Sequence, residues 1–179
     1  MAGGKLDQQN PFEHDTATFG AGITMTATDG QTFTAGKTGA LDRVAVYLEH
    51  DLVEPLPPGK IFLDIYPTDG AGLPRTDRSA LGSGSVPTSA AARPEGFVTI
   101  PLSHPAAVKK GTVYAIVLRS DVDIEFSVAW DGSTGPDLYP RGGEAERADV
   151  SAPWEVFPRQ DHFFKTFVTE PRKHHRHHR

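Results

Sequence analysis

Aromatic and charged residues of the types used in sugar-binding sites gather between positions 130 and 157. They are Trp130, Asp137, Tyr139, Arg141 and Trp154. Sugar rings have apolar C–H faces that stack on exposed indoles, while charged side chains hydrogen-bond to their hydroxyls. This stretch therefore predicts a glycan-binding surface. The alternative is that Trp130 ends a buried strand face and that Trp154 fixes a long loop in place.

The end of the chain is a second candidate site, because it combines adjacent histidines with basic residues. It includes Arg172, Lys173, His174, His175 and Arg176 and continues to Arg179. Adjacent imidazoles chelate transition metals, whereas a short basic arm contacts a neighbouring subunit or an anionic surface. A solvated tail or part of an affinity tag is the third alternative. We favour the arm over the metal site.

The motifs that accompany catalysis are absent from the sequence. It has no Gly-x-Ser-x-Gly elbow, no His-Glu-x-x-His, no phosphate loop and no Gly-x-Gly-x-x-Gly. Glu144 and Glu146 are paired carboxylates, but the polar stretch around them offers nothing apolar that would raise a pKa. Asp121 and Asp123 are only a fragment of a calcium loop, and acidic residues in turns are usually solvated. We therefore expect no enzyme activity, no cofactor and no metal.

Composition and charge exclude several classes of partner. The whole chain carries 18 Lys and Arg against 23 Asp and Glu; without the four bases of residues 172–179, 14 bases face 23 acids, a net charge of −9. Nucleic acid needs a basic face, so it is not an expected partner. The absence of cysteine excludes disulfides and thiolate metal sites. The longest apolar run, 113–118, is far below the ~18 residues that cross a bilayer, so no membrane partner is expected.

Period-two alternation of apolar residues predicts strands along most of the chain. Residues 31–48 are typical of a strand, a turn bracketed by Gly36 and Gly39, and a longer strand. Asp29-Gly30 predicts a hairpin turn, and the stretch 80–86, rich in Gly and Ser, predicts an edge strand. Residues 131–161 are expected to be irregular. Further strands are predicted at 6–10, 23–27, 60–66, 97–102, 112–119, 124–131 and 162–169.

No stretch shows a sustained helical period, so the pattern predicts an all-β fold. Eight to ten short antiparallel strands with frequent turn signals indicate a jelly-roll β-sandwich or a barrel, without substantial helix. We expect residues 1–170 to form a single domain and residues 171–179 to follow it as a basic His/Arg-rich tail.

The motifs of the chain resemble a family of jelly-roll β-sandwich modules of bacteria and their phages. The opening signature Q-T-F-T-A-G followed by G-x-L-x-x-V-x-L-x-L is similar to residues 31–48, and G-T-x-Y-A-I-V-L is similar to residues 111–118. The motifs Y-x-x-G-G and D-x-x-F-R-T-Y-V resemble residues 139–143 and 161–168. The resemblance covers about residues 6 to 170. It implies a non-catalytic module of virion, extracellular or cell-surface proteins, similar to carbohydrate-binding modules.

Two functions are compatible with this resemblance. The first is a phage virion component, such as a tail, fibre-associated or capsid-decorating subunit, which would contact other virion subunits or form a homo-oligomer. The second is a carbohydrate-binding module for a bacterial surface or cell-wall glycan, located outside the cell or on its surface. We favour the virion role, because the chain is a free-standing module that starts without an export signal and lacks cysteine.

Overall fold

The structure is a computed structural model of the 179-residue chain. It describes residues 3–11, 18–23, 28–49, 57–91, 96–122, 126–130 and 137–171. Nearly all of the regular structure in these ranges is β-strand, and the helical part is one 3-10 turn, Thr88–Ala91.

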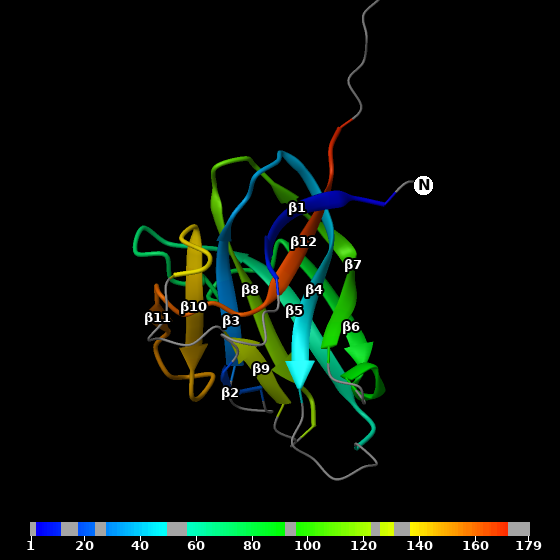
Figure 1. The fold of residues 1–179 in the computed structure, drawn as a ribbon, viewed down its shortest axis with the longest axis vertical. Coiled ribbons are helices and arrows are strands. Elements are labelled where there is room, and N and C mark those ends of the chain that lie inside the picture. Colours follow the sequence, from blue (N-terminus) through cyan, green and yellow to red (C-terminus); the bar gives the residue numbers. More distant parts are fainter. Residues whose placement is uncertain are drawn as a thin grey trace, which may run out of the picture.

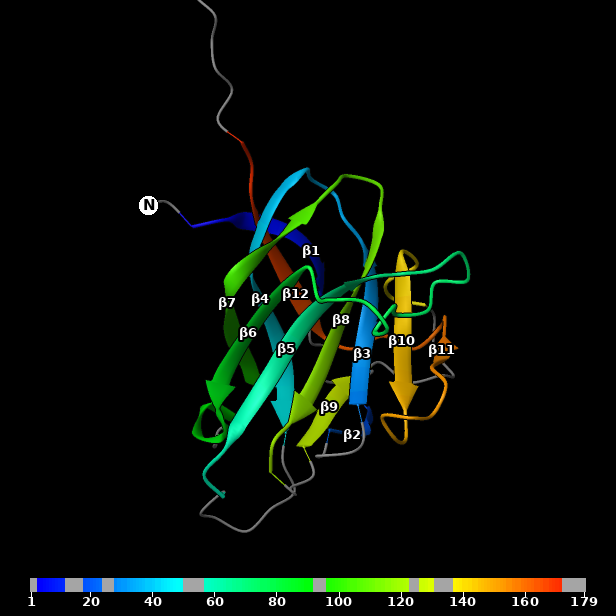
Figure 2. The same ribbon diagram turned by 180° about the vertical axis from the view of Figure 1, so that it is seen from behind.

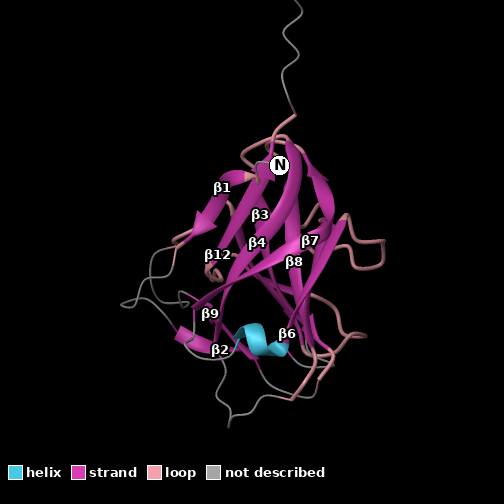
Figure 3. Ribbon diagram, turned by 90° about the vertical axis from the view of Figure 1, so that its right-hand side faces the viewer, coloured by secondary structure: helices cyan, strands magenta, loops and turns pink. Residues whose placement is uncertain are grey.

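The strands form two antiparallel layers that face each other (Figure 3). The front layer in Figure 1 has the order β1–β12–β4–β7, and β9 and β2 continue from the far end of β4. Its strands are β1 (Lys5–Asn10), β2 (Thr18–Ile23), β4 (Gly39–Glu49), β7 (Gly96–Val108), β9 (Phe126–Trp130) and β12 (Phe164–Thr169).

The back layer has the order β6–β5–β8–β3–β10–β11, which can be followed across Figure 2. Its strands are β3 (Thr28–Thr34), β5 (Lys60–Pro67), β6 (Gly82–Pro87), β8 (Val113–Ser120), β10 (Gly142–Arg147) and β11 (Glu155–Phe157). The long strand β7 pairs with β4 and, at Leu102 and His104, also with β6. The two layers therefore join into one curled sheet.

The predicted all-β, jelly-roll-like fold class is confirmed. The described residues contain twelve strands, slightly more than the eight to ten predicted, because β10 and β11 are short strands within a stretch expected to be irregular. Two of the predicted strands have the expected burial. Ile61, Leu63 and Ile65 of β5 are fully buried, and β8 is buried on both faces from Tyr114 to Leu118.

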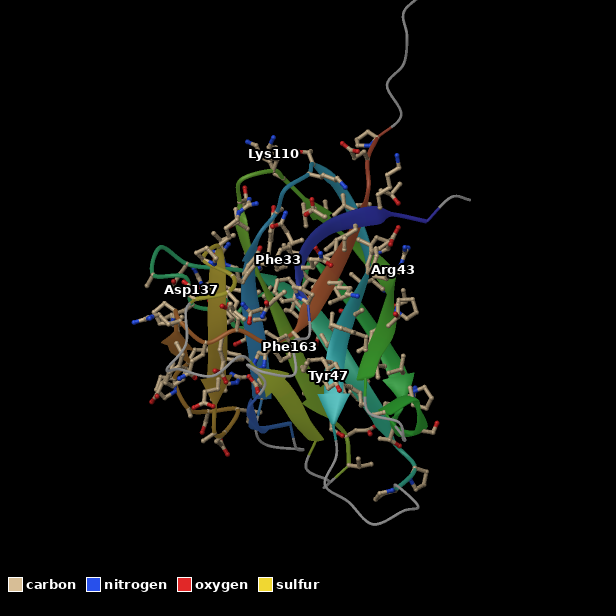
Figure 4. The ribbon with its side chains drawn as sticks, viewed as in Figure 1. Phe33, Arg43, Tyr47, Lys110, Asp137 and Phe163 are labelled. Atoms are coloured by element: carbon tan, nitrogen blue, oxygen red, sulfur yellow. The ribbon has the colours of Figure 1, made fainter. Side chains whose placement is uncertain are left out.

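Large apolar side chains fill the space between the layers. Phe33 of β3 contacts both Tyr114 of β8 and Phe164 of β12, with ring centroids 6.0 and 6.3 Å apart. A smaller group of aromatic residues, Tyr47, Phe97 and Phe163, packs beside the main core. Figure 4 labels Phe33, Tyr47 and Phe163.

The predicted hairpin turn at Asp29-Gly30 is wrong, because both residues lie inside β3. Asp29 pairs with Leu118 and Gly30 with Val117 of β8. A Cβ atom on Gly30 would lie 2.5 Å from the carbonyl oxygen of Ile116. Glycine at this position therefore permits a close approach of two strands rather than a turn.

The predicted edge position of residues 80–86 is also wrong. The strand β6 has a partner on each side, β5 and β7, and forms the corner where the two layers meet. A Cβ atom on Gly84 would clash with the carbonyl oxygen of Pro101. The small residues that suggested an edge instead allow the sheet to bend sharply.

We expect Gly142→Ala to destabilise the fold, because an added Cβ would clash with the backbone carbonyl of Thr32 on β3. Overpacking of this kind costs about 1–3 kcal/mol. Urea unfolding followed by circular dichroism measures the change. Gly70→Ala is the matched control, since nothing lies within 4 Å of a Cβ at Gly70. Equal midpoints for the two variants would contradict the prediction.

Candidate functional site

A cluster of buried polar residues lies where β3, β10 and the segment before β12 meet. Asp29, Glu144 and His162 are each only 2% exposed. His162 Nε2 lies 2.9 Å from Asp29 Oδ1 and 3.7 Å from Glu144 Oε1. The cluster exists because Asp29, Gln31 and Phe33 alternate on β3, so the face that places Phe33 in the core also turns both polar side chains inward.

Gln31 and Asp161 hold the cluster in place. The backbone N–H of His162 donates to Gln31 Oε1 at 2.7 Å, and Gln31 Nε2 donates to Asp161 Oδ1 at 2.7 Å. The Asp161 carboxylate also accepts from the backbone N–H of Tyr139 at 3.3 Å. These bonds fix the backbone of His162 against β3, so its imidazole is positioned before any ligand binds.

The imidazole of His162 is surrounded by carboxylates. Burial by itself would lower the pKa of His162, but the neighbouring Asp29, Glu144 and Asp161 outweigh this effect and raise the pKa to about 9. The side chain is therefore an imidazolium at neutral pH, and it forms a buried ion pair with Asp29.

A second candidate site is a shallow surface pocket of about 130 Å³ at the β10–β11 hairpin. We call it the hairpin pocket. Its lining combines two acidic side chains, one basic side chain and three small or cyclic residues: Glu146, Arg147, Ala148, Ala152, Pro153 and Glu155. Partial burial, together with Asp29 and Glu155, raises the pKa of Glu146.

Trp154 lies between two residues that line the hairpin pocket, and its indole is half-buried. The indole Nε1 donates to Thr76 Oγ1 at 3.1 Å, and the Arg147 guanidinium carbon lies 4.8 Å from the ring centroid. Arg147 in turn donates to Thr28 Oγ1 at 2.9 Å and to the carbonyl oxygen of Val150 at 3.0 Å. Trp154 does not itself line the pocket, but it is an oriented side chain in contact with Arg147, which does.

Tyr139 is too deeply buried to belong to the predicted glycan-binding surface. Tyr139 is 5% exposed, and its ring packs edge-on against Phe164 with centroids 5.0 Å apart. Its hydroxyl donates to Gln8 Oε1 at 3.0 Å, and burial raises its pKa to about 12. A sugar cannot reach this ring, because Tyr139 is buried in the core.

The other predicted residues have different placements. Arg141 is exposed. Asp137 is half-buried and lies at the side of the molecule next to β10 (Figure 4). The backbone of Trp130 ends β9, but its side chain lies outside the described part of the chain. The predicted contact residues Arg172, Lys173, His174, His175 and Arg176 also lie outside the described residues.

One Ser–His contact has the composition of a nucleophile with its base. Ser103 Oγ lies 3.3 Å from His104 Nδ1 on an exposed stretch of β7. The Ser103 hydroxyl donates its hydrogen to the carbonyl oxygen of Ser83 at 3.0 Å. Its proton is therefore not directed at the imidazole, and this pair lacks the geometry of an activated serine.

The sequence interpretation missed the buried cluster, because Asp29 was assigned to a turn and Glu144 to a polar loop. The signal that identifies it is the alternation of Asp29 and Gln31 with Phe33. Asp161 and His162 directly precede the aromatic pair of Phe163 and Phe164, which is a second indication that these polar side chains are buried.

Comparisons with known proteins show a likeness of fold. No protein-family model and no curated protein matches the sequence. Among solved structures, the chain is similar to that of the cysteine protease and lectin-like domains of Cwp84, a surface layer associated protein of Clostridium difficile. The TM-score is 0.54, the identity is 14%, and the match spans 89% of this chain and 37% of that one. At this identity the likeness shows the fold alone.

Within the described ranges, no helix is long and apolar enough to cross a membrane.

Proposed function

We propose that this protein is a non-enzymatic carbohydrate-binding module of a cell surface or an extracellular assembly, and that it binds glycan at the hairpin pocket. The observation that carries the proposal is the oriented indole of Trp154, which contacts Arg147, together with the pocket that Arg147 lines with Glu146 and Glu155. An indole offers a surface for the C–H face of a sugar, and the charged groups offer hydrogen bonds to its hydroxyls.

The size of the hairpin pocket limits the ligand. A volume of about 130 Å³ is well below the roughly 300–1,000 Å³ of pockets that enclose a drug-sized ligand. The pocket therefore suits one terminal sugar unit, or one unit of a longer chain that passes over the surface. The likeness to a structure that contains a lectin-like domain supports this class of function, as does the surface association of that protein.

We expect Trp154→Ala to abolish binding to any glycan that the unmodified protein selects on a glycan array. Loss of the indole removes the stacking surface and leaves Arg147 without its aromatic partner. Isothermal titration with the selected glycan gives the change in Kd, which should exceed tenfold. Val150→Ala is the control, because Val150 is exposed in the same hairpin and does not line the pocket.

An unchanged affinity of Trp154→Ala for the glycan, with the fold intact by circular dichroism, would contradict the proposed binding site. Absence of glycan binding by the unmodified protein would overturn the proposed function.

A role as a phage virion component stays a prediction of the sequence. It is tested by co-purification with particles, by the oligomeric state, and by whether neighbouring genes encode capsid and tail proteins.

A further inference from the structure

The buried cluster brings three metal-ligating side chains to one point from distant parts of the chain. Asp29 lies in β3, Glu144 in β10, and His162 two residues before β12. One ligand atom of each residue can be chosen so that all three lie within 4.8 Å of one another. A solvated group of surface charges does not explain this arrangement, because all three residues are almost completely buried.

The distances within the cluster are close to those of a coordinated ion. Metal–ligand bonds of about 2.0–2.1 Å in a tetrahedral site place neighbouring ligand atoms roughly 3.3–3.5 Å apart. The observed separations from His162 Nε2 are 2.9 Å to Asp29 and 3.7 Å to Glu144, one slightly shorter and one slightly longer. Asp29 and Glu144 offer oxygen atoms within 4.8 Å of each other, so all three ligands can approach one ion after side-chain adjustment.

The charge and hydrogen bonding of the cluster also favour the binding of a cation. The carboxylates of Asp29, Glu144 and Asp161 surround the imidazole of His162, so the electrostatic environment at this point favours a positive charge. Asp29 Oδ2, on the carboxylate that faces His162 Nε2, is buried and has no hydrogen-bond partner among the described residues. Buried polar atoms without partners are rare in folded proteins, and an ion or a water usually explains them.

We propose that Asp29, Glu144 and His162 bind one divalent transition-metal ion of the first row, such as Zn²⁺, which replaces the proton on His162 Nε2 and releases it to solvent. The ligand set of one imidazole and two carboxylates selects this class of ion, since Ca²⁺ and Mg²⁺ take oxygen ligands. Gln31 and Asp161 support the site from outside, because their hydrogen bonds fix the backbone of His162. A bound ion would clamp β3, β10 and the segment before β12 together.

The test uses the 179-residue chain with His174, His175, His177 and His178 replaced by glutamine, because the tail histidines would themselves chelate metal. After treatment with a chelator and dialysis, the protein is titrated with ZnCl₂ at neutral pH. We expect one Zn²⁺ per chain by elemental analysis and a higher Tm. With Co²⁺ in place of Zn²⁺, we expect the visible absorption of a tetrahedral site.

Variants of the cluster then locate the ion. His162→Gln and Glu144→Gln should each lose the stoichiometric Zn²⁺, whereas the control His104→Gln, which changes an exposed histidine of β7, should retain it. Thermal unfolding without metal shows which variants are folded. The Co²⁺ spectrum is recorded on the protein with an intact cluster, so it still tests the proposal if both cluster variants unfold. No bound metal in the protein with an intact cluster, or full binding in both folded variants, would overturn the proposal.

Discussion

Asp29→Ala should lower the free energy of unfolding by about 3–5 kcal/mol, measured at neutral pH in the presence of a chelator. Removal of one partner of a buried ion pair costs this much, because the other charge stays buried without its closest counter-charge. Here the imidazolium of His162 loses Asp29 Oδ1 at 2.9 Å and, among the described residues, keeps only the more distant Glu144 Oε1, at 3.7 Å, as an ion-pair partner. The substitution also removes the acceptor for the backbone N–H of Gly30.

The matched control is Asp77→Ala. Asp77 also pairs with a basic side chain, since Arg75 Nη2 lies 2.8 Å from its Oδ2, but the pair is exposed to solvent. Exposed ion pairs contribute little to stability, so urea unfolding of this variant should follow that of the unmodified protein. If the two aspartate variants were equally stable, the buried pair would not have the energetic role that its geometry indicates.

The stability of the metal-free protein should decrease as the pH rises from about 6.5 to 10. The folded-state pKa of His162 is raised to about 9, whereas an unfolded histidine titrates near 6.5. The stabilisation from the imidazolium is therefore fully present below about pH 6.5 and is lost as the pH rises through 9. Since each pKa unit corresponds to about 1.4 kcal/mol, the total loss should be a few kcal/mol.

Urea unfolding at a series of pH values measures this effect, and NMR titration of the imidazole measures the pKa itself. His162→Gln, where it folds, should show a flatter profile over the same range, because the titrating group is gone. Tyr139, whose pKa of about 12 lies above this range, does not contribute to the expected decrease. A profile that is level or rising between pH 6.5 and 10 would contradict the prediction.

Local patterns were sufficient to predict most of the scaffold. The alternation of Ile61, Leu63 and Ile65 predicted a strand with one buried face, and the structure has that strand as β5 with these side chains in the core. The continuous apolar run at residues 113–118 predicted burial on both faces, which is confirmed in β8. Alternation with a period of two involves only residues that are close together in the sequence. It therefore predicts which face of a strand is buried without knowledge of the tertiary structure.

Residues typical of turns gave wrong predictions at positions where pairing with a distant strand determines their role. Asp29-Gly30 has the composition of a hairpin turn, but its location between β8 and β10 makes it the interior of β3. Gly82 and Gly84 suggested an edge, yet they permit the close packing of β6 against β7 at the corner. Whether a glycine serves a turn or a close approach depends on the neighbouring strand, which is distant in the sequence.

For the candidate sites too, some features could be predicted from the sequence and others depend on the tertiary structure. The sequence by itself determined the all-β class, the main strand faces, and Trp154 as an aromatic residue of interest. Only the tertiary structure brought Trp154 to Arg147 and Thr76, placed Tyr139 in the core, and joined His162 to Asp29 across 133 positions of the chain. The physical reason is that alternation and turn propensity are local properties. A buried ion pair or a pocket requires long-range strand pairing, which no local pattern specifies.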